Sequence, residues 1–122
     1  MQQPRTEKTA ALYEAFKLSK NEAERSAFDF NEETILREFT HWYIIKSRFP
    51  YDTMARVNDL LVLKRPVAHH HDMTDSEAAE YQAIMDLITE ENYYDALIQN
   101  FPRVQSVKHH VHVHLICWHH TN

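Results

Sequence analysis

Histidine is the residue type whose number and spacing in this sequence point most directly to chemistry. The chain contains 10 histidines among 122 residues. Nine of them fall in three clusters, at 69–71, 109–114 and 119–120. In the second cluster, His110, His112 and His114 alternate with apolar residues. This alternation is typical of a β-strand with one polar and one apolar face, so the three imidazoles are predicted to form a row.

A row of three histidines is open to three interpretations. It can be a solvated or hydrogen-bonded polar face, since unpaired burial of imidazoles is costly. It can supply two ligands to a metal such as zinc, with a third from His41 or from residues 69–71. All three cannot bind one ion, because His110 and His114 lie ~13 Å apart along an extended strand. It can also bind an extended phosphate, with His112 as the nucleophile, because neutral imidazole is nucleophilic near neutral pH.

The sequence around the row resembles the signature of the histidine-triad (HIT) family, His-φ-His-φ-His-φ-φ, where φ is apolar. Residues 110–116 fill all seven places. Ser106 lies where a large branch of the family has a serine. Upstream, the segments YIIKSRFPYD and DLLVLKRPV are similar to an earlier hairpin of the family. The resemblance covers roughly residues 39–118.

The resemblance implies an α+β fold with a five-stranded antiparallel sheet. It also implies an enzyme that hydrolyses or transfers nucleotides by cleaving at the α-phosphorus, with no required cofactor. His112 would become transiently nucleotidylated, His114 would contact phosphate near the leaving group, and His110 would orient His112 or its neighbours. Further contacts to phosphate or to the leaving group are implied for Asn100, Gln105 and Ser106.

The hairpin departs from the family pattern at Ser47, where the family has an asparagine, and at two positions where the family has a histidine. Asp59 replaces a histidine there, and a carboxylate at that place would repel phosphate. Pro66 replaces another histidine, and residues 69–71 are expected to form a polar loop rather than to substitute for it. Asn100 can equally be a turn residue before Pro102. The alternative function is therefore a catalytically altered HIT-fold protein that binds a nucleotide or a metal, such as zinc, in a regulatory role.

The composition narrows the class of protein further. With 43% hydrophobic and 25% charged residues in 14.6 kDa, the chain is expected to form one globular domain. A net charge of −5 argues against a general nucleic-acid-binding surface, and no apolar run is long enough for a membrane span. The single cysteine, Cys117, excludes an intrachain disulfide and favours a reducing compartment, so we expect a cytoplasmic protein.

Two local features add to this interpretation. The chain has no glycine, so phosphate-binding glycine loops are excluded and turns with positive φ must use Asn, Asp or His. Residues 41–68 carry five basic and two acidic side chains, a positive patch expected to suit a small anion. The many aromatic residues and the dimeric state common among HIT proteins together predict a twofold homodimer.

The elements that must position the histidine row follow from periodicity and capping signals. Residues 7–20 are predicted to form a helix, and 110–116 a strand. Thr74 and Glu77 fit a capping box, so a second helix is expected to run to about Thr89. Other strands are predicted over 39–47, 59–64 and 93–99, the last with a helix as the alternative.

The second predicted helix carries an apolar stripe that should pack on the sheet. Its members recur at helical spacing and are Tyr81, Ile84, Met85 and Ile88. Helices and strands do not alternate regularly, which favours an α+β fold over a parallel one. We expect a single HIT-like domain over 1–122, with a helical extension over 1–38 and the core over 39–118.

Overall fold

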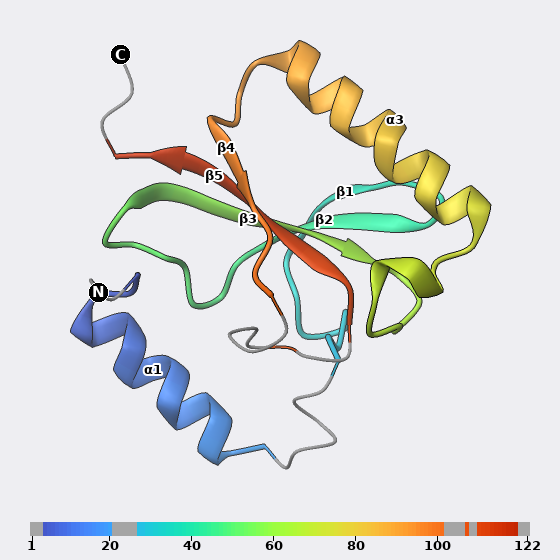
Figure 1. The fold of residues 1–122 in the computed structure, drawn as a ribbon. Coiled ribbons are helices and arrows are strands. Elements are labelled where there is room, and N and C mark those ends of the chain that lie inside the picture. Colours follow the sequence, from blue (N-terminus) through green and yellow to red (C-terminus); the bar gives the residue numbers. More distant parts are fainter. Residues whose placement is uncertain (1–3, 21–26, 102–106, 108–109, 120–122) are drawn as a thin grey trace.

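The computed structural model describes residues 4–20, 27–101, 107 and 110–119. Its elements are α1 (Glu7–Leu18), β1 (Ile35–Glu38), β2 (Trp42–Lys46), β3 (Ala55–Leu63), the 3₁₀ turn η1 (His70–Asp72), α3 (Asp75–Glu91), β4 (Ala96–Ile98) and β5 (His112–Trp118). The strands form one antiparallel sheet in the order β1-β2-β3-β5-β4 (Figure 1). This confirms the predicted α+β class. None of the described helices is long and apolar enough to cross a membrane.

Helix α3 covers one face of the sheet. It begins with the predicted capping box, in which the Thr74 side chain accepts from the Glu77 backbone and the Glu77 side chain accepts from the Thr74 backbone. Its apolar stripe packs on the main core, as predicted, with Ile84 and Ile88 buried. The strands contribute residues of the same face to this core: Trp42, Ile44, Leu61, Leu63, Val113 and Leu115.

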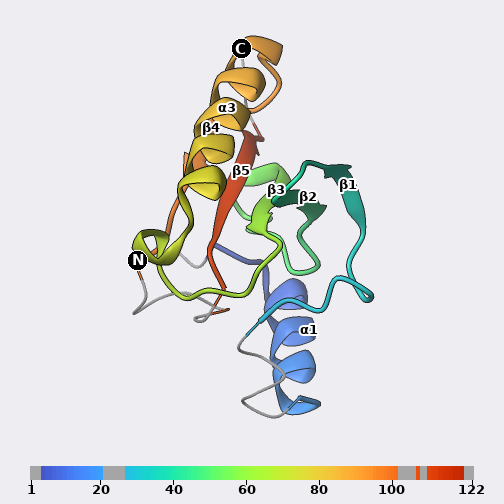
Figure 2. The same ribbon diagram turned by 90° about the vertical axis from the view of Figure 1, so that its right-hand side faces the viewer.

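Helix α1 lies on the opposite side of the sheet from α3 (Figures 1 and 2). None of its residues is buried, so it is not part of the main core. A smaller apolar cluster covers this second face, where Ile45, Leu60 and Val62 pack against Phe28 and Phe30. The second face is therefore closed by the segment before β1 and by α1, which are both N-terminal to the predicted core.

Several predicted elements are confirmed and others are extended or added. The helix predicted over 7–20 is α1, and the strand predicted over 93–99 is confirmed by the short β4. Strand β3 begins at Ala55, earlier than predicted, and β1 was not predicted. Strand β1 is an edge strand with mostly exposed residues, so it has no buried alternating pattern to reveal it.

A single residue, Asn92, has positive φ among the described residues. It ends α3 in the left-handed conformation, with φ 55° and ψ 39°. Asparagine is the residue other than glycine that tolerates this conformation best, as the glycine-free composition requires.

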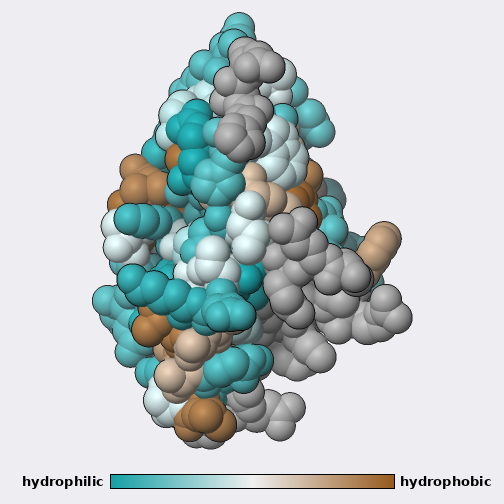
Figure 3. Space-filling model, turned by 90° about the vertical axis from the view of Figure 1, so that its left-hand side faces the viewer, coloured by the Kyte–Doolittle hydropathy of each residue, from teal (hydrophilic) through white to brown (hydrophobic). Residues whose placement is uncertain are grey.

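Some of the basic residues in the segment 41–68, which is predicted to form a positive patch, pair with acidic residues. Lys64 pairs with Glu38, and Arg65 pairs with Glu77 at the start of α3. Of the five basic residues in this segment, only Arg48 lines the pocket described below. The fold separates the basic residues of this segment in space, which a count of charges along the sequence cannot show. On the face shown in Figure 3, hydrophilic residues cover most of the coloured surface, and hydrophobic residues form separate patches.

Candidate active site

The three histidines of the row lie at and just before the start of β5, and all are buried. Their exposed fractions are 2% for His110, 5% for His112 and 6% for His114. The intervening valines and Leu115 face the main core, so the predicted alternation is confirmed. In the register with β3, His112 lies opposite Val62 and His114 lies opposite Leu60. The row therefore occupies the sheet face that α3 leaves uncovered.

Two backbone groups hold the His110 ring. The N–H of Phe28 donates to His110 Nδ1 at 3.0 Å, so Nδ1 is the unprotonated nitrogen. His110 Nε2 then carries the hydrogen and donates to the carbonyl of Leu63. The rings of Phe28 and Phe30 contact the imidazole edge-on, with centroids 5.2 and 5.6 Å away. His110 is thus a neutral, fully bonded side chain with no nitrogen left for a substrate.

His112 has the opposite tautomer. Its Nδ1 lies 2.8 Å from the carbonyl oxygen of His110, and a carbonyl can only accept, so Nδ1 carries the hydrogen. Nε2 therefore keeps its lone pair. The ring of Phe28 packs against the imidazole at 5.2 Å and limits its rotation. The unprotonated Nε2 is the atom of this site suited to nucleophilic attack.

His114 is oriented by an amide whose own direction is determined. The Oδ1 of Asn58 accepts from the backbone N–H of Tyr51 at 3.0 Å, so its Nδ2 is the donor. That Nδ2 lies 3.2 Å from His114 Nδ1, which must accept. His114 Nε2 therefore carries the hydrogen and can donate to an oxygen of a ligand. The Tyr51 ring stacks on the imidazole, with centroids 4.4 Å apart and an angle of 18°.

Burial keeps the three histidines neutral. It is the main cause that lowers the pKa of His110, His112 and His114. For His112, the hydrogen bond to His110 opposes this effect and His70 adds to it. For His114, burial, His112 and Arg5 together lower the pKa to about 3. At neutral pH the lone pair of His112 is consequently available.

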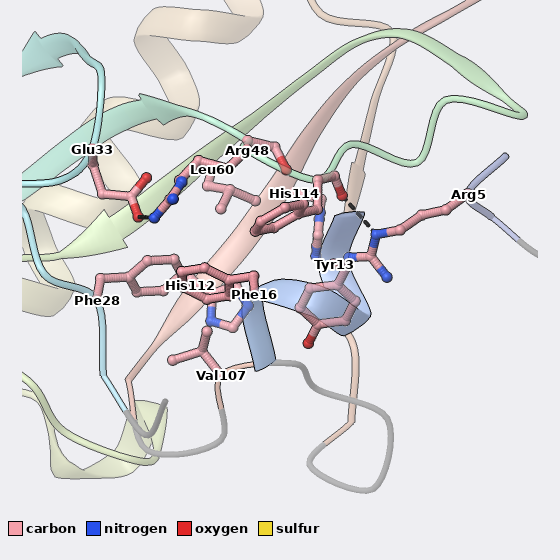
Figure 4. A pocket seen from close by; sticks show the side chains of 12 residues that line it. Arg5, Tyr13, Phe16, Phe28, Glu33, Arg48, Leu60, Val107, His112 and His114 are labelled. Atoms are coloured by element: carbon pink, nitrogen blue, oxygen red, sulfur yellow. Dashed lines mark hydrogen bonds and ion pairs between the residues drawn. The ribbon is translucent and has the colours of Figure 1, made fainter. Parts of the chain in front are cut away.

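A pocket opens beside His112 and His114 (Figure 4). Helix α1 contributes Tyr13 and Phe16 to its wall, and the segment before α1 contributes Arg5. The remaining lining residues are Phe28, Glu33, Ser47, Arg48, Phe49, Leu60 and Val107. The pocket is thus bounded by the histidine row on one side and by the N-terminal helix on the other.

Comparison with solved structures identifies proteins with a similar fold. A histidine triad protein from Clostridium difficile is 21% identical, with a TM-score of 0.54 over 74% of this chain and 82% of that one. A HIT family hydrolase from Clostridium thermocellum is 23% identical, with a TM-score of 0.52 over 87% of each chain. This chain has the HIT fold. No protein-family model matches its sequence, and no curated protein matches it significantly.

Within this HIT fold, the structure treats the other predicted site residues differently. Asn100 lies near the row, because its Nδ2 donates to the hydroxyl of Tyr51 at 2.8 Å. Its predicted contact with phosphate is untested. Gln105 and Ser106 lie outside the described residues.

The expectation that Asp59 repels phosphate at the site is wrong. Asp59 pairs with Leu115 and shares the sheet face of α3, where its Oδ2 accepts from the Tyr94 hydroxyl at 2.6 Å. Burial raises the pKa of Asp59, while Tyr94 and Lys46 oppose the rise. The run of apolar residues after Asp59 has no alternation, so the sequence does not reveal which face it occupies.

Three residues of this candidate site were missed by sequence reasoning. Asn58 and Tyr51 orient His114, and Arg5 reaches the pocket from the N-terminal segment. Asn58 lies on the same face of β3 as Leu60. Residues of both faces are buried in this part of β3, so the sequence has no polar–apolar alternation that would show which face Asn58 occupies. No local signal links Arg5 to the row.

The histidines at 69–71 lie at the turn η1, shortly before α3. His69 is the N-cap of the turn and His70 and His71 lie within it, consistent with the predicted loop role. His70 is half-buried against the edge of Tyr81, with centroids 5.9 Å apart. Among the described residues, no group of three or more histidine, cysteine or acidic side chains is arranged to hold a metal ion. Cys117 is buried and its thiol donates to the Tyr93 carbonyl, in keeping with a structural role.

Proposed function

We propose that this protein is a nucleotide hydrolase or nucleotidyl transferase that works through a transient nucleotidyl-His112 intermediate. The observation that carries the proposal is the pair of opposite tautomers in the pocket. His112 presents an unprotonated Nε2, and the neighbouring His114 presents an Nε2–H. A phosphoryl group needs this combination of a nucleophile and a hydrogen-bond donor.

In the first step, Nε2 of His112 attacks the α-phosphorus. A P–N bond forms, the bond from phosphorus to the leaving group breaks, and the leaving group takes the bonding electron pair. A leaving amine also takes a proton from solvent, whereas a leaving phosphate departs as an anion. Positive charge develops on the imidazole of His112, and the carbonyl of His110 stabilises it through Nδ1–H. His114 donates its Nε2–H to a phosphate oxygen and stays neutral. His110 acts as a positioning residue, because Phe28 and Leu63 lock its ring.

In the second step, water or another acceptor attacks the same phosphorus. The P–N bond breaks, its electron pair returns to His112 Nε2, and the acceptor loses its proton to solvent. Hydrolysis releases a nucleoside monophosphate, and transfer to another acceptor gives a new nucleotide conjugate. We include Asn100, Gln105 and Ser106 in the proposal as phosphate-binding residues, with support for Asn100 from its place beside Tyr51.

Release of nucleoside monophosphate tests the proposal. The substrates are nucleoside phosphoramidates and dinucleoside polyphosphates, and the variant is His112→Ala. We expect a loss of kcat of at least about 10³-fold, because the nucleophile is removed. The matched control is His71→Ala, which removes an exposed histidine outside the pocket and should leave the rate unchanged. Equal rates for the wild type and His112→Ala would contradict the proposal, as would an inactive wild type.

Trapping the intermediate gives a second test. Rapid acid-free denaturation during turnover, followed by peptide mass analysis, should reveal one nucleotidyl group on the peptide that contains His112. A label on another peptide would contradict the assignment of the nucleophile. The His112→Ala protein should carry no label.

A further inference from the structure

Arg5, which directly precedes the N-cap of α1, is held in a defined position beside the histidine row. Its Nε donates to the carbonyl of Phe49 at 2.7 Å, a bond drawn in Figure 4. Its guanidinium carbon lies 4.5 Å from the centre of the Tyr13 ring and 4.8 Å from that of Tyr51. Both contacts are cation–π contacts, which hold the guanidinium in place.

Tyr51 connects Arg5 to His114. One ring contact joins Tyr51 to the imidazole at 4.4 Å, and the cation–π contact joins it to the guanidinium. Arg5 is also one of the causes that lower the pKa of His114, after burial and His112. The positive charge of Arg5 therefore acts on the imidazole of His114, whose Nε2–H is available to a ligand.

Arg5 is the uncompensated cation of the pocket. Among the described residues, none of its nitrogens lies within 4.0 Å of a carboxylate oxygen, and its terminal Nη atoms have no hydrogen-bond partner. Arg48, the other cation that lines the pocket, lies 3.6 Å from Glu32 and 3.9 Å from Glu33. An arginine fork without an acidic partner is suited to bidentate binding of phosphate.

The segment that carries Arg5 is fastened to the loop between β2 and β3. Asp52 accepts from the backbone of Thr6 and from the hydroxyls of Thr6 and Thr9. The carbonyl of Pro4 accepts from both the backbone and the hydroxyl of Thr53. These bonds on both sides of Arg5 position its guanidinium before any ligand arrives, which lowers the entropic cost of binding.

The tautomer of His114 restricts the leaving group. Nδ1 of His114 accepts from Asn58, so Nε2–H is its single proton. Giving that proton away would leave an imidazolate, so His114 serves as a hydrogen-bond donor and not as an acid. A leaving group that departs as an anion, such as a phosphate, needs no proton and gains from a nearby cation. An amine leaving group must instead gain a proton to depart, and a nearby cation does not assist its departure.

We propose that Arg5 binds an anionic group of the substrate beside His114, and that the preferred substrate carries a phosphate in its leaving group. The claim about the preferred substrate rests on the proposed function. The claim that Arg5 binds an anionic group does not depend on it. Arg5 is then a specificity-determining residue supplied by a segment outside the sheet.

Calorimetry with inorganic pyrophosphate tests the binding part without any reaction. We expect pyrophosphate to bind the wild type and to bind Arg5→Met at least about 10-fold more weakly, because a charge-assisted contact is lost. Methionine preserves the apolar stem between the two tyrosine rings. The control is Arg37→Met, which removes a cation that pairs with Glu91 of α3. Equal affinity in Arg5→Met and the wild type, or no binding to the wild type, would overturn the proposal.

Two substrates with the same nucleoside and α-phosphate test the specificity part. In a dinucleoside triphosphate the leaving group is an anionic nucleoside diphosphate, and in a nucleoside phosphoramidate it is an amine. For Arg5→Met, kcat/KM should fall at least about 10-fold with the first substrate and less than about threefold with the second. Equal losses with both would overturn the role of Arg5 in specificity.

The outcomes separate the two proposals. If neither substrate is turned over, the proposed function fails, and the pyrophosphate measurement still decides whether Arg5 binds an anion. If Arg5→Met lowers the melting temperature strongly, Arg5→Lys replaces it, because lysine keeps the charge and loses the fork. Arg5→Lys should then bind pyrophosphate more weakly than the wild type does, because the bidentate contact is lost. Equal affinity of Arg5→Lys and the wild type would overturn the binding of pyrophosphate by the guanidinium of Arg5.

Discussion

At the scale of single residues, the hydrogen-bond partner determines what each histidine can do. The same side chain accepts at Nδ1 in His110 and His114 but donates there in His112. The difference comes from the neighbouring group, which is a backbone N–H, an amide N–H or a carbonyl. Only His112 is left with a free lone pair at Nε2, and this singles it out from the row more directly than its central position does.

The acid limb of the pH profile is predicted at this scale. Attack requires neutral His112, and burial lowers the pKa of His112 from its ordinary value of 6.5. The neutral form therefore persists below pH 6.5, and kcat/KM should fall only at lower pH. The measurement is kcat/KM from pH 4 to pH 9, with circular dichroism at each pH to show that the protein stays folded. The limb reports the coupled histidines rather than His112 alone.

A half-maximal rate at pH 6.5 or above would contradict this prediction. It would mean that the imidazole is more solvated than the structure indicates. The corresponding control is the His71→Ala variant, whose profile should coincide with that of the wild type.

At the scale of elements, the start of α3 is joined to the end of β3 by one buried carboxylate. Glu77 accepts from the backbone of Thr74 and, through both oxygens, from Arg65. The Arg65 hydrogen bond is the main cause that lowers the pKa of Glu77, to about 2, against the opposing effect of burial. The Trp42 indole donates to the backbone carbonyl of Glu77. This junction keeps α3 on the face opposite the histidines.

We predict that Glu77→Gln lowers the free energy of unfolding by about 1–3 kcal/mol, through loss of the charge in a capping box and in the pair with the exposed Arg65 side chain. The control is Glu90→Gln, an exposed position of the same helix. Both are compared by urea denaturation at neutral pH. Equal stability of the two variants would contradict a role for the junction.

The pH dependence of the same variant follows from the sign of the shift. The pKa of Glu77 is lowered on folding, from 4.5 to about 2, so its contribution is present above pH 4.5 and is lost as the pH falls to about 2. Between these values the wild type should lose its advantage over Glu77→Gln. A constant difference across this range would contradict the assignment.

At the scale of the whole molecule, apolar residues gather at the β4 edge of the sheet. Among the described strands, β4 pairs only with β5, so no described strand covers its other edge. The exposed fractions are 53% for Tyr93, 40% for Leu97 and 83% for Phe101. An open edge with exposed apolar side chains is a site for pairing with another strand, and a twofold axis lets the same edge pair with itself.

We predict that two chains associate through β4. Light scattering at micromolar concentration should give about twice 14.6 kDa for the wild type, and 14.6 kDa for Leu97→Lys, because a charge at the edge opposes pairing. The control is Leu18→Lys, which places the same charge at an exposed leucine at the end of α1. A wild type of 14.6 kDa would contradict the dimer.

The sequence by itself determined the local features of this protein. Alternation predicted the histidine face of β5, and the capping box with its apolar stripe predicted α3, because these signals depend on neighbours only a few residues apart. The tertiary structure decided the tautomers of the histidines and the position of Asp59 on the sheet face opposite the histidine row. It also decided that Arg5 and α1 line the pocket. Each of these depends on a partner from a distant segment, so it exists only once strand register and packing have brought the segments together.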